Sequence, residues 1–95
     1  MYYILFYKTV PDYKEKRTSY RAEHLNLAKA AADRGELVLG GALDDPADSA
    51  VLVFKSDNPS VAEEFAKVDP YVLNGVVTEW EVRPWTVVIG TAFQG

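Results

Sequence analysis

The sequence of 95 residues contains no cysteine and only one histidine, His24. The absence of cysteine excludes disulfide bonds, a thiolate nucleophile and zinc sites built on sulfur. Nothing then indicates an oxidising compartment, and we expect the protein in the cytoplasm. No apolar run approaches the roughly 18 residues that a membrane-spanning helix needs, so we expect no membrane partner.

Basic residues are fewer than acidic ones. Ten Lys and Arg stand against fourteen Asp and Glu, which gives a net charge of −4. Binding of nucleic acid through its phosphates needs an excess of positive charge on the protein. We therefore expect no nucleic-acid partner.

Motifs for metal, phosphate and serine-hydrolase sites are missing as well. Asp44, Asp45 and Asp48 lack the glycine and the twelfth-position glutamate of a calcium loop. Gly40 and Gly41 lack the spacing of a phosphate-binding loop, and no G-x-S-x-G elbow is present. We predict that the two glycines end a short strand and permit a bulge or a close backbone approach beside a ligand. We expect neither a metal nor a cofactor.

What is present is typical of one globular domain. Hydrophobic residues make up 48% of the chain and aromatic residues 13%. No repeat, linker or low-complexity tract divides it, so we predict a single domain over residues 1–95. A domain this short buries only roughly 60 to 65% of the surface of its unfolded chain, and a partner subunit would help to stabilise it.

The pattern of apolar residues predicts alternating strands and helices. We expect strands over 2–9, 36–39, 50–54 and 76–83, helices over 13–34 and from 59 to 68, a turn at 44–48, a connector at 71–75, and an interruption at Pro84 before an extended stretch over 85–89. Asn58 is expected to cap the second helix, with Pro59 at its first position.

This order predicts an α+β fold of the ferredoxin-like βαββαβ type, with an antiparallel sheet and a C-terminal strand extension. Both helices of such a fold cover one face of the sheet and leave the other face open. Trp80, Trp85 and the aromatic first strand hold more apolar area than one face readily uses. We therefore predict a homodimer.

His24 follows Tyr20 by four residues and precedes Ala28 by four, so it lies on or beside the buried stripe of its helix. Two interpretations are open from this position. His24 is either a core histidine with its hydrogen bonds satisfied, or a general acid/base held in a cleft.

Charged residues accompany His24 in two places. Arg17 and Arg21 precede it on the same helical surface, where they are either solvated cations or a clamp for an anion. Asp69 precedes Pro70 at the exit of a helix, where it is either a turn former or a carboxylate that reaches His24. A carboxylate on an imidazole nitrogen would fix the tautomer and strengthen the base.

Four segments together resemble the YCII-related (YciI-like) family: 21–25 (RAEHL), 35–43 (GELVLGGAL), 69–75 (DPYVLNG) and 83–85 (RPW). The resemblance spans essentially the whole chain. It implies a dimeric α+β barrel with a pocket in which His24 and Asp69 form a catalytic dyad, with Gly41 and Tyr71 in the pocket wall. It also implies a small cyclic or hydroxylated aromatic substrate, because enzymes of this family, a dehydrochlorinase among them, act on such compounds. Related dimeric α+β barrels include lactone isomerases and monooxygenases that need no cofactor.

Two functions follow as hypotheses. The first is a cofactor-independent enzyme in which His24 moves a proton, with Asp69 orienting it, in an elimination, isomerisation or dehydrochlorination. The second is a non-catalytic dimer that binds a small, anionic metabolite or serves a regulatory role.

Overall fold

The structure, a computed structural model, describes residues 1–93. Its elements are β1 (Tyr2–Thr9), α1 (Tyr13–Lys16), the 3-10 helix η1 (Arg17–Ser19), α2 (Arg21–Asp33), β2 (Leu37–Ala42), β3 (Ser49–Lys55), α3 (Ser60–Val68), α4 (Pro70–Leu73) and β4 (Val77–Trp85).

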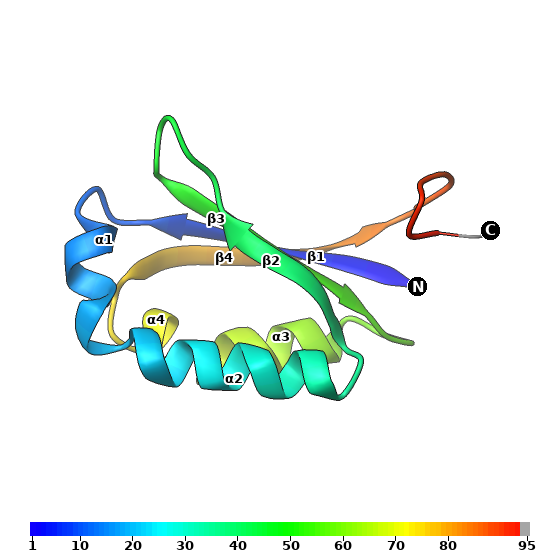
Figure 1. The fold of residues 1–95 in the computed structure, drawn as a ribbon, viewed down its shortest axis with the longest axis horizontal. Helices are drawn as coiled ribbons and strands as arrows, with labels where there is room; N and C mark the ends of the chain where they lie inside the picture. The colour runs from blue at the N-terminus through cyan, green and yellow to red at the C-terminus, as the bar shows by residue number, and fades with distance from the viewer. Residues whose placement is uncertain (94–95) are drawn as a thin grey trace.

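The strands form one antiparallel sheet in the order β2-β3-β1-β4, with the first strand of the chain in the interior. The helices α2, α3 and α4 lie together on one face of this sheet (Figure 1). The order and the one-sided cover are those of the predicted ferredoxin-like α+β fold, which is confirmed.

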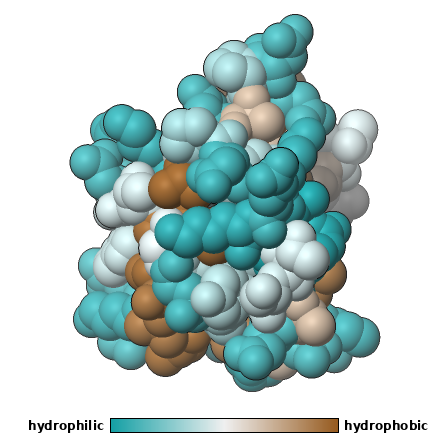
Figure 2. All heavy atoms as spheres, turned by 90° about the vertical axis from the view of Figure 1, so that its left-hand side faces the viewer, coloured by the Kyte–Doolittle hydropathy of each residue, from teal (hydrophilic) through white to brown (hydrophobic). Residues whose placement is uncertain are grey.

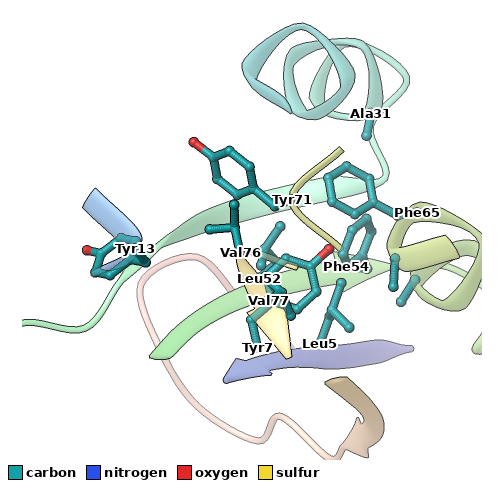
Figure 3. Packing of buried hydrophobic residues seen from close by; sticks show 12 residues of the cluster. Leu5, Tyr7, Tyr13, Ala31, Leu52, Phe54, Phe65, Tyr71, Val76 and Val77 are labelled. Atoms are coloured by element: carbon teal, nitrogen blue, oxygen red, sulfur yellow. The ribbon is translucent and has the colours of Figure 1, made fainter. Parts of the chain in front are cut away.

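The register decides which side chains face the helices. Leu5 lies opposite Leu52 on β3 and Val82 on β4, so these three side chains share one face. Leu5 is fully buried there, and Tyr7 and Phe54 on the same face are 2% and 0% exposed. Figure 3 shows these side chains pointing from the strands toward the aromatic residues of the helical layer. The core therefore lies between the helices and this face, which we name the inner face.

The other face of the sheet, the outer face, presents apolar side chains to solvent. Phe6, Leu39 and Trp85 are 37%, 63% and 45% exposed. Phe6 follows inward-facing Leu5 in β1 and so faces outward. Trp85 pairs with Tyr2, and Leu39 pairs with Val53, the partner of Ile4, so both lie on the face of Phe6.

The single helix predicted over 13–34 is wrong in detail, because the chain forms α1, η1 and α2 instead. The backbone of Tyr20 has φ −118° and ψ −4°, and its N–H donates to the carbonyl of Arg17. Helix α2 then starts with the N–H of His24 donating to the carbonyl of Tyr20 at 3.0 Å. His24 consequently lies in the first turn of a new helix, with Arg21 at its first position.

Two predictions at sheet edges are also wrong. Gly40 and Gly41 lie inside β2 and do not end it. Pro84 lies inside β4, which continues to Trp85. Because β2 and β4 are the edge strands of the sheet, each tolerates a residue that weakens a ladder.

The end of the chain departs from the extended stretch expected over 85–89. Only Trp85 belongs to a strand, as the last residue of β4. Beyond it, Val88 and Ile89 are 75% and 86% exposed.

The predicted connector at 71–75 contains the short helix α4. Asp69 caps this helix, since its side chain accepts a hydrogen bond from the backbone N–H of Tyr71 at 3.0 Å, and Pro70 occupies the first helical position. This hydrogen bond holds the carboxylate of Asp69 in the interior of the molecule. At the start of α3 the prediction is wrong by one residue, because the helix begins at Ser60 and Pro59 occupies its N-cap position. Asn58 still contributes there, since its Oδ1 accepts a hydrogen bond from the N–H of Ser60.

Candidate active site

Asp69 is a buried carboxylate at the junction of α3 and α4, and none of its surface is exposed. Besides the N–H of Tyr71, it accepts a hydrogen bond from the hydroxyl of Tyr7, with 2.7 Å between the oxygens. Its third partner is the Nδ1 of His24, 2.8 Å from Oδ1 and 3.0 Å from Oδ2. A buried carboxylate is costly unless donors surround it, and here three donors satisfy it.

His24 projects from the first turn of α2, and its side chain is 15% exposed. Since a carboxylate accepts and does not donate, Nδ1 of His24 carries the hydrogen that it shares with Asp69. In the neutral ring the lone pair is then on Nε2, at the other end of the imidazole. Such a nitrogen can take a proton from a bound molecule and return it.

Aromatic side chains fix the plane of the His24 ring. The ring of Tyr71 is stacked on it at a centroid distance of 3.9 Å and an interplanar angle of 7°. Phe65 approaches edge-on at 6.4 Å and 79°. Burial raises the pKa of the Tyr71 hydroxyl, and the positive charges of Arg17 and Arg21 oppose this rise. Tyr71 is therefore a neutral, flat support for the imidazole.

Tyr7 completes the network, and sequence reasoning did not select it as a site residue. Burial, followed by the charge and the hydrogen bond of Asp69, raises the pKa of the Tyr7 hydroxyl far above its ordinary value. It is thus a permanent donor to Asp69 at neutral pH. The alternation of β1 places Tyr7 on the inner face, and a tyrosine hydroxyl in a core requires a partner, which is the signal that could have found it.

A cavity of about 280 Å³ opens beside these residues, between the inner face of the sheet and the helices α1, η1 and α2. Its polar lining comprises His24, Arg17, Arg21 and Thr9, and the remaining lining residues are Tyr7, Tyr13, Leu25, Ala28, Leu37, Gly40, Gly41, Ala42, Ala50, Leu52, Tyr71 and Val77. Figure 2 looks onto this end of the molecule, where hydrophilic residues surround smaller hydrophobic areas. The cavity is thus mostly apolar, with its basic side chains on the helical side.

The structure brings together the residues that were selected from the sequence. Five of them line the cavity, namely His24, Arg17, Arg21, Gly41 and Tyr71. Asp69 lies behind His24 and is closed off from solvent. Gly40 and Gly41 contribute strand backbone to the lining, and a Cβ atom added at Gly41 would meet no other atom within 4 Å.

Within residues 1–93, no cluster of three or more His, Asp or Glu residues is arranged to hold a metal ion. In the same range no helix combines the length and the apolar character needed to cross a membrane.

The fold and the site together define a ferredoxin-like α+β protein with a partly buried His–Asp pair at a mostly apolar pocket. The chain belongs to the family of the YCII-related domain, which matches residues 1–86. An uncharacterised protein of Haemophilus influenzae is 31% identical over 97 aligned residues, which cover 93% of this chain and 99% of that protein. The protein YciI of Escherichia coli is 28% identical with the same coverage.

A solved structure has a similar fold. It is 5-chloro-2-hydroxyhydroquinone dehydrochlorinase (TftG) of Burkholderia phenoliruptrix in complex with 2,5-dihydroxybenzoquinone. The TM-score is 0.74 at 18% sequence identity, over 90% of this chain and 94% of that one. At this identity the comparison establishes the shared fold.

Proposed function

We propose that this protein is an enzyme that moves a proton on a small cyclic or aromatic organic compound, with no cofactor. The observation that carries the proposal is the geometry of His24, whose Nδ1 is held by Asp69 while the ring lines the cavity. This is how a general base is oriented. A structural neighbour of the same fold is a dehydrochlorinase, which agrees with this class of reaction.

In the proposed step, Nε2 of His24 takes a proton from a hydroxyl or an acidic C–H of the substrate. The electron pair left behind forms a new π bond. In an isomerisation the adjacent π bond of the substrate breaks, and its electrons take the proton back from the imidazolium at another atom. In an elimination the bond to a leaving group such as chloride breaks, chloride departs with that electron pair, and the proton passes to solvent. Asp69 stabilises the imidazolium in both cases because its charge lies 2.8 Å from Nδ1.

We further propose that the protein is a homodimer that covers its outer face with a second copy. The exposure of Phe6, Leu39 and Trp85 on that face supports this, since an exposed apolar face on a domain of this size is typical of an interaction surface.

The proposed function is tested with two probe reactions, neither of which requires a cofactor. Chloride release is measured from 5-chloro-2-hydroxyhydroquinone, and deuterium uptake from D₂O is measured by NMR for a panel of enolisable cyclic ketones. We expect the protein to accelerate at least one reaction, and the variant His24→Asn to lose about 10²- to 10⁴-fold of the rate.

Two results would contradict the proposed enzymatic function. An undiminished rate in His24→Asn would show that the imidazole is not the base. Tight binding of a probe that is always recovered unchanged would favour the metabolite-binding dimer instead.

A further inference from the structure

The charged residues that line the cavity are all basic, whereas the molecule as a whole carries a net negative charge. The chain has fourteen acidic and ten basic residues, yet the lining of the cavity contains Arg17, Arg21 and His24 and no Asp or Glu. The carboxylate of Asp69, behind the ring, is already engaged by three donors. The cavity is therefore a positive site on a protein of net charge −4.

Neither arginine is neutralised by a neighbour. In the part of the chain that the structure describes, ion pairs join His24 to Asp69, Lys29 to Asp33, Arg34 to Glu36 and Lys67 to Glu64. Arg34 is an arginine with a carboxylate partner, since its Nε lies 2.8 Å from Oε1 of Glu36. Arg17 and Arg21 belong to none of these pairs, and both line the cavity.

The guanidinium of Arg17 is also held in place. It lies over the ring of Tyr13 at 5.2 Å from the centroid, and Tyr13 is only 4% exposed. A cation that rests on a buried ring loses little further freedom when it binds an anion. Arg21 stands one helical turn before His24 on α2, and side chains at this spacing have Cβ atoms about 5 to 6 Å apart. An anionic group at the arginines and a reacting atom at His24 thus fit on one small molecule.

The size of the cavity and its other lining residues indicate the size and the apolar character of the rest of that molecule. A cavity of about 280 Å³ exceeds the roughly 150 Å³ that suffices for benzene in an apolar protein cavity. Its walls carry Tyr7, Tyr13 and Tyr71 together with aliphatic side chains. This favours a single ring with a few substituents.

We propose that the site takes a small ring compound with an acidic substituent, a carboxylate or a phenolate, whose negative charge is held by Arg17 and Arg21. This inference rests on the proposed function for its location, since it names the substrate class of the same cavity. It adds that the site binds an anionic compound more tightly than a neutral analogue of the same shape.

The test compares benzoate with benzamide, which have similar shapes and differ in charge. Dissociation constants are measured by calorimetry at low and at high salt. We expect benzoate to bind about tenfold or more tightly than benzamide at low salt, and the difference to shrink at high salt. The variant Arg17→Gln/Arg21→Gln should lose the preference, while Arg17→Lys/Arg21→Lys should keep part of it.

A matched control, Lys29→Gln/Lys67→Gln, removes the same two charges from exposed positions outside the cavity and should retain the wild-type preference. Equal binding of the two probes, no benzoate binding at millimolar concentration, or a preference that survives in Arg17→Gln/Arg21→Gln would overturn the inference. The readout needs no turnover. An inactive protein that prefers benzoate would refute the proposed enzyme alone, and an active one without the preference would refute the anion site alone.

Discussion

The Nδ1 of His24 lies 2.8 Å from Oδ1 of Asp69, although 45 positions separate the two residues in the chain. One comes from the first turn of α2 and the other from the cap of α4, so the contact exists only in the folded protein. The pairing leaves a single nitrogen of the imidazole for chemistry in the cavity, and several measurable consequences follow from it.

The first prediction concerns the tautomer of His24. Asp69→Asn removes the charge that holds the hydrogen on Nδ1, so the neutral ring should no longer favour one tautomer, and proton-transfer rates should fall about 10²- to 10⁴-fold. Because the chain has one histidine, two-bond ¹⁵N–¹H NMR reads this ring without an assignment problem. Asp33→Asn, an exposed change on the same helix, is the control and should leave the spectrum as in the wild type. If the tautomer is unchanged in Asp69→Asn, the carboxylate of Asp69 does not orient the imidazole.

A second prediction follows from the hydroxyl of Tyr7. Tyr7→Phe keeps the ring but takes a donor from buried Asp69, so it should lower the free energy of unfolding by about 1 to 3 kcal/mol at pH 8, measured in urea.

The same variant gives a pH dependence with a defined sign. The pKa of Tyr7 is raised in the folded protein above its ordinary value of 10.0, so the stability from this group is complete below pH 10 and is lost as pH rises beyond it. The unfolded chain releases this proton above pH 10 while the folded one keeps it. The gap between wild type and Tyr7→Phe should therefore narrow by up to about 1.4 kcal/mol per pH unit there. A gap that stays constant would show that the hydroxyl ionises in the folded state as it does in the unfolded one.

Sequence patterns predicted the elements of this fold because its core depends on local periodicity. The density of aromatic and apolar residues in β1 and the apolar stripe of α3 are each visible within ten residues. The errors arose where the outcome depends on distant parts of the chain. Pro84 and Gly40 are tolerated because β4 and β2 are edge strands, and edge position is a property of the whole sheet.

The site was predictable in part for the same reason. Asp69 was selected as an acid at the expected exit of a helix, although the structure shows it at the N-cap of α4, where an acid is common. The lone histidine on a predicted buried stripe was the second signal. The inward-facing hydroxyl of Tyr7 indicates that a partner is needed, but the sequence does not identify that partner, because Asp69 lies 62 positions away. The break at Tyr20 involves neither proline nor glycine, and it is what sets Arg21 and His24 at the start of a separate helix.

A third prediction separates the ring of Tyr71 from its hydroxyl. Tyr71→Phe keeps the surface stacked on His24 at 3.9 Å, and should change the rate by less than about threefold. Tyr71→Leu removes the flat support, so the imidazole gains freedom and the rate should fall about tenfold or more. The backbone N–H that Tyr71 donates to Asp69 is present in both variants. Equal rates in the two variants would show that stacking does not position the base.

The fourth prediction concerns the outer face. If a second copy covers it, the protein should sediment at twice the 10.6 kDa of one chain. Phe6 lies on the interior strand β1, so Phe6→Lys would place a charge from each copy within the covered area, and an unpaired buried charge is costly. This variant should sediment as a monomer at micromolar concentration. Leu73→Lys introduces the same charge at a more exposed site on α4, 67% accessible in the free chain, and should remain dimeric because that helix belongs to the opposite layer. A monomeric wild type would refute the homodimer, and a Phe6→Lys variant that still dimerises would show that the second copy binds outside the outer face.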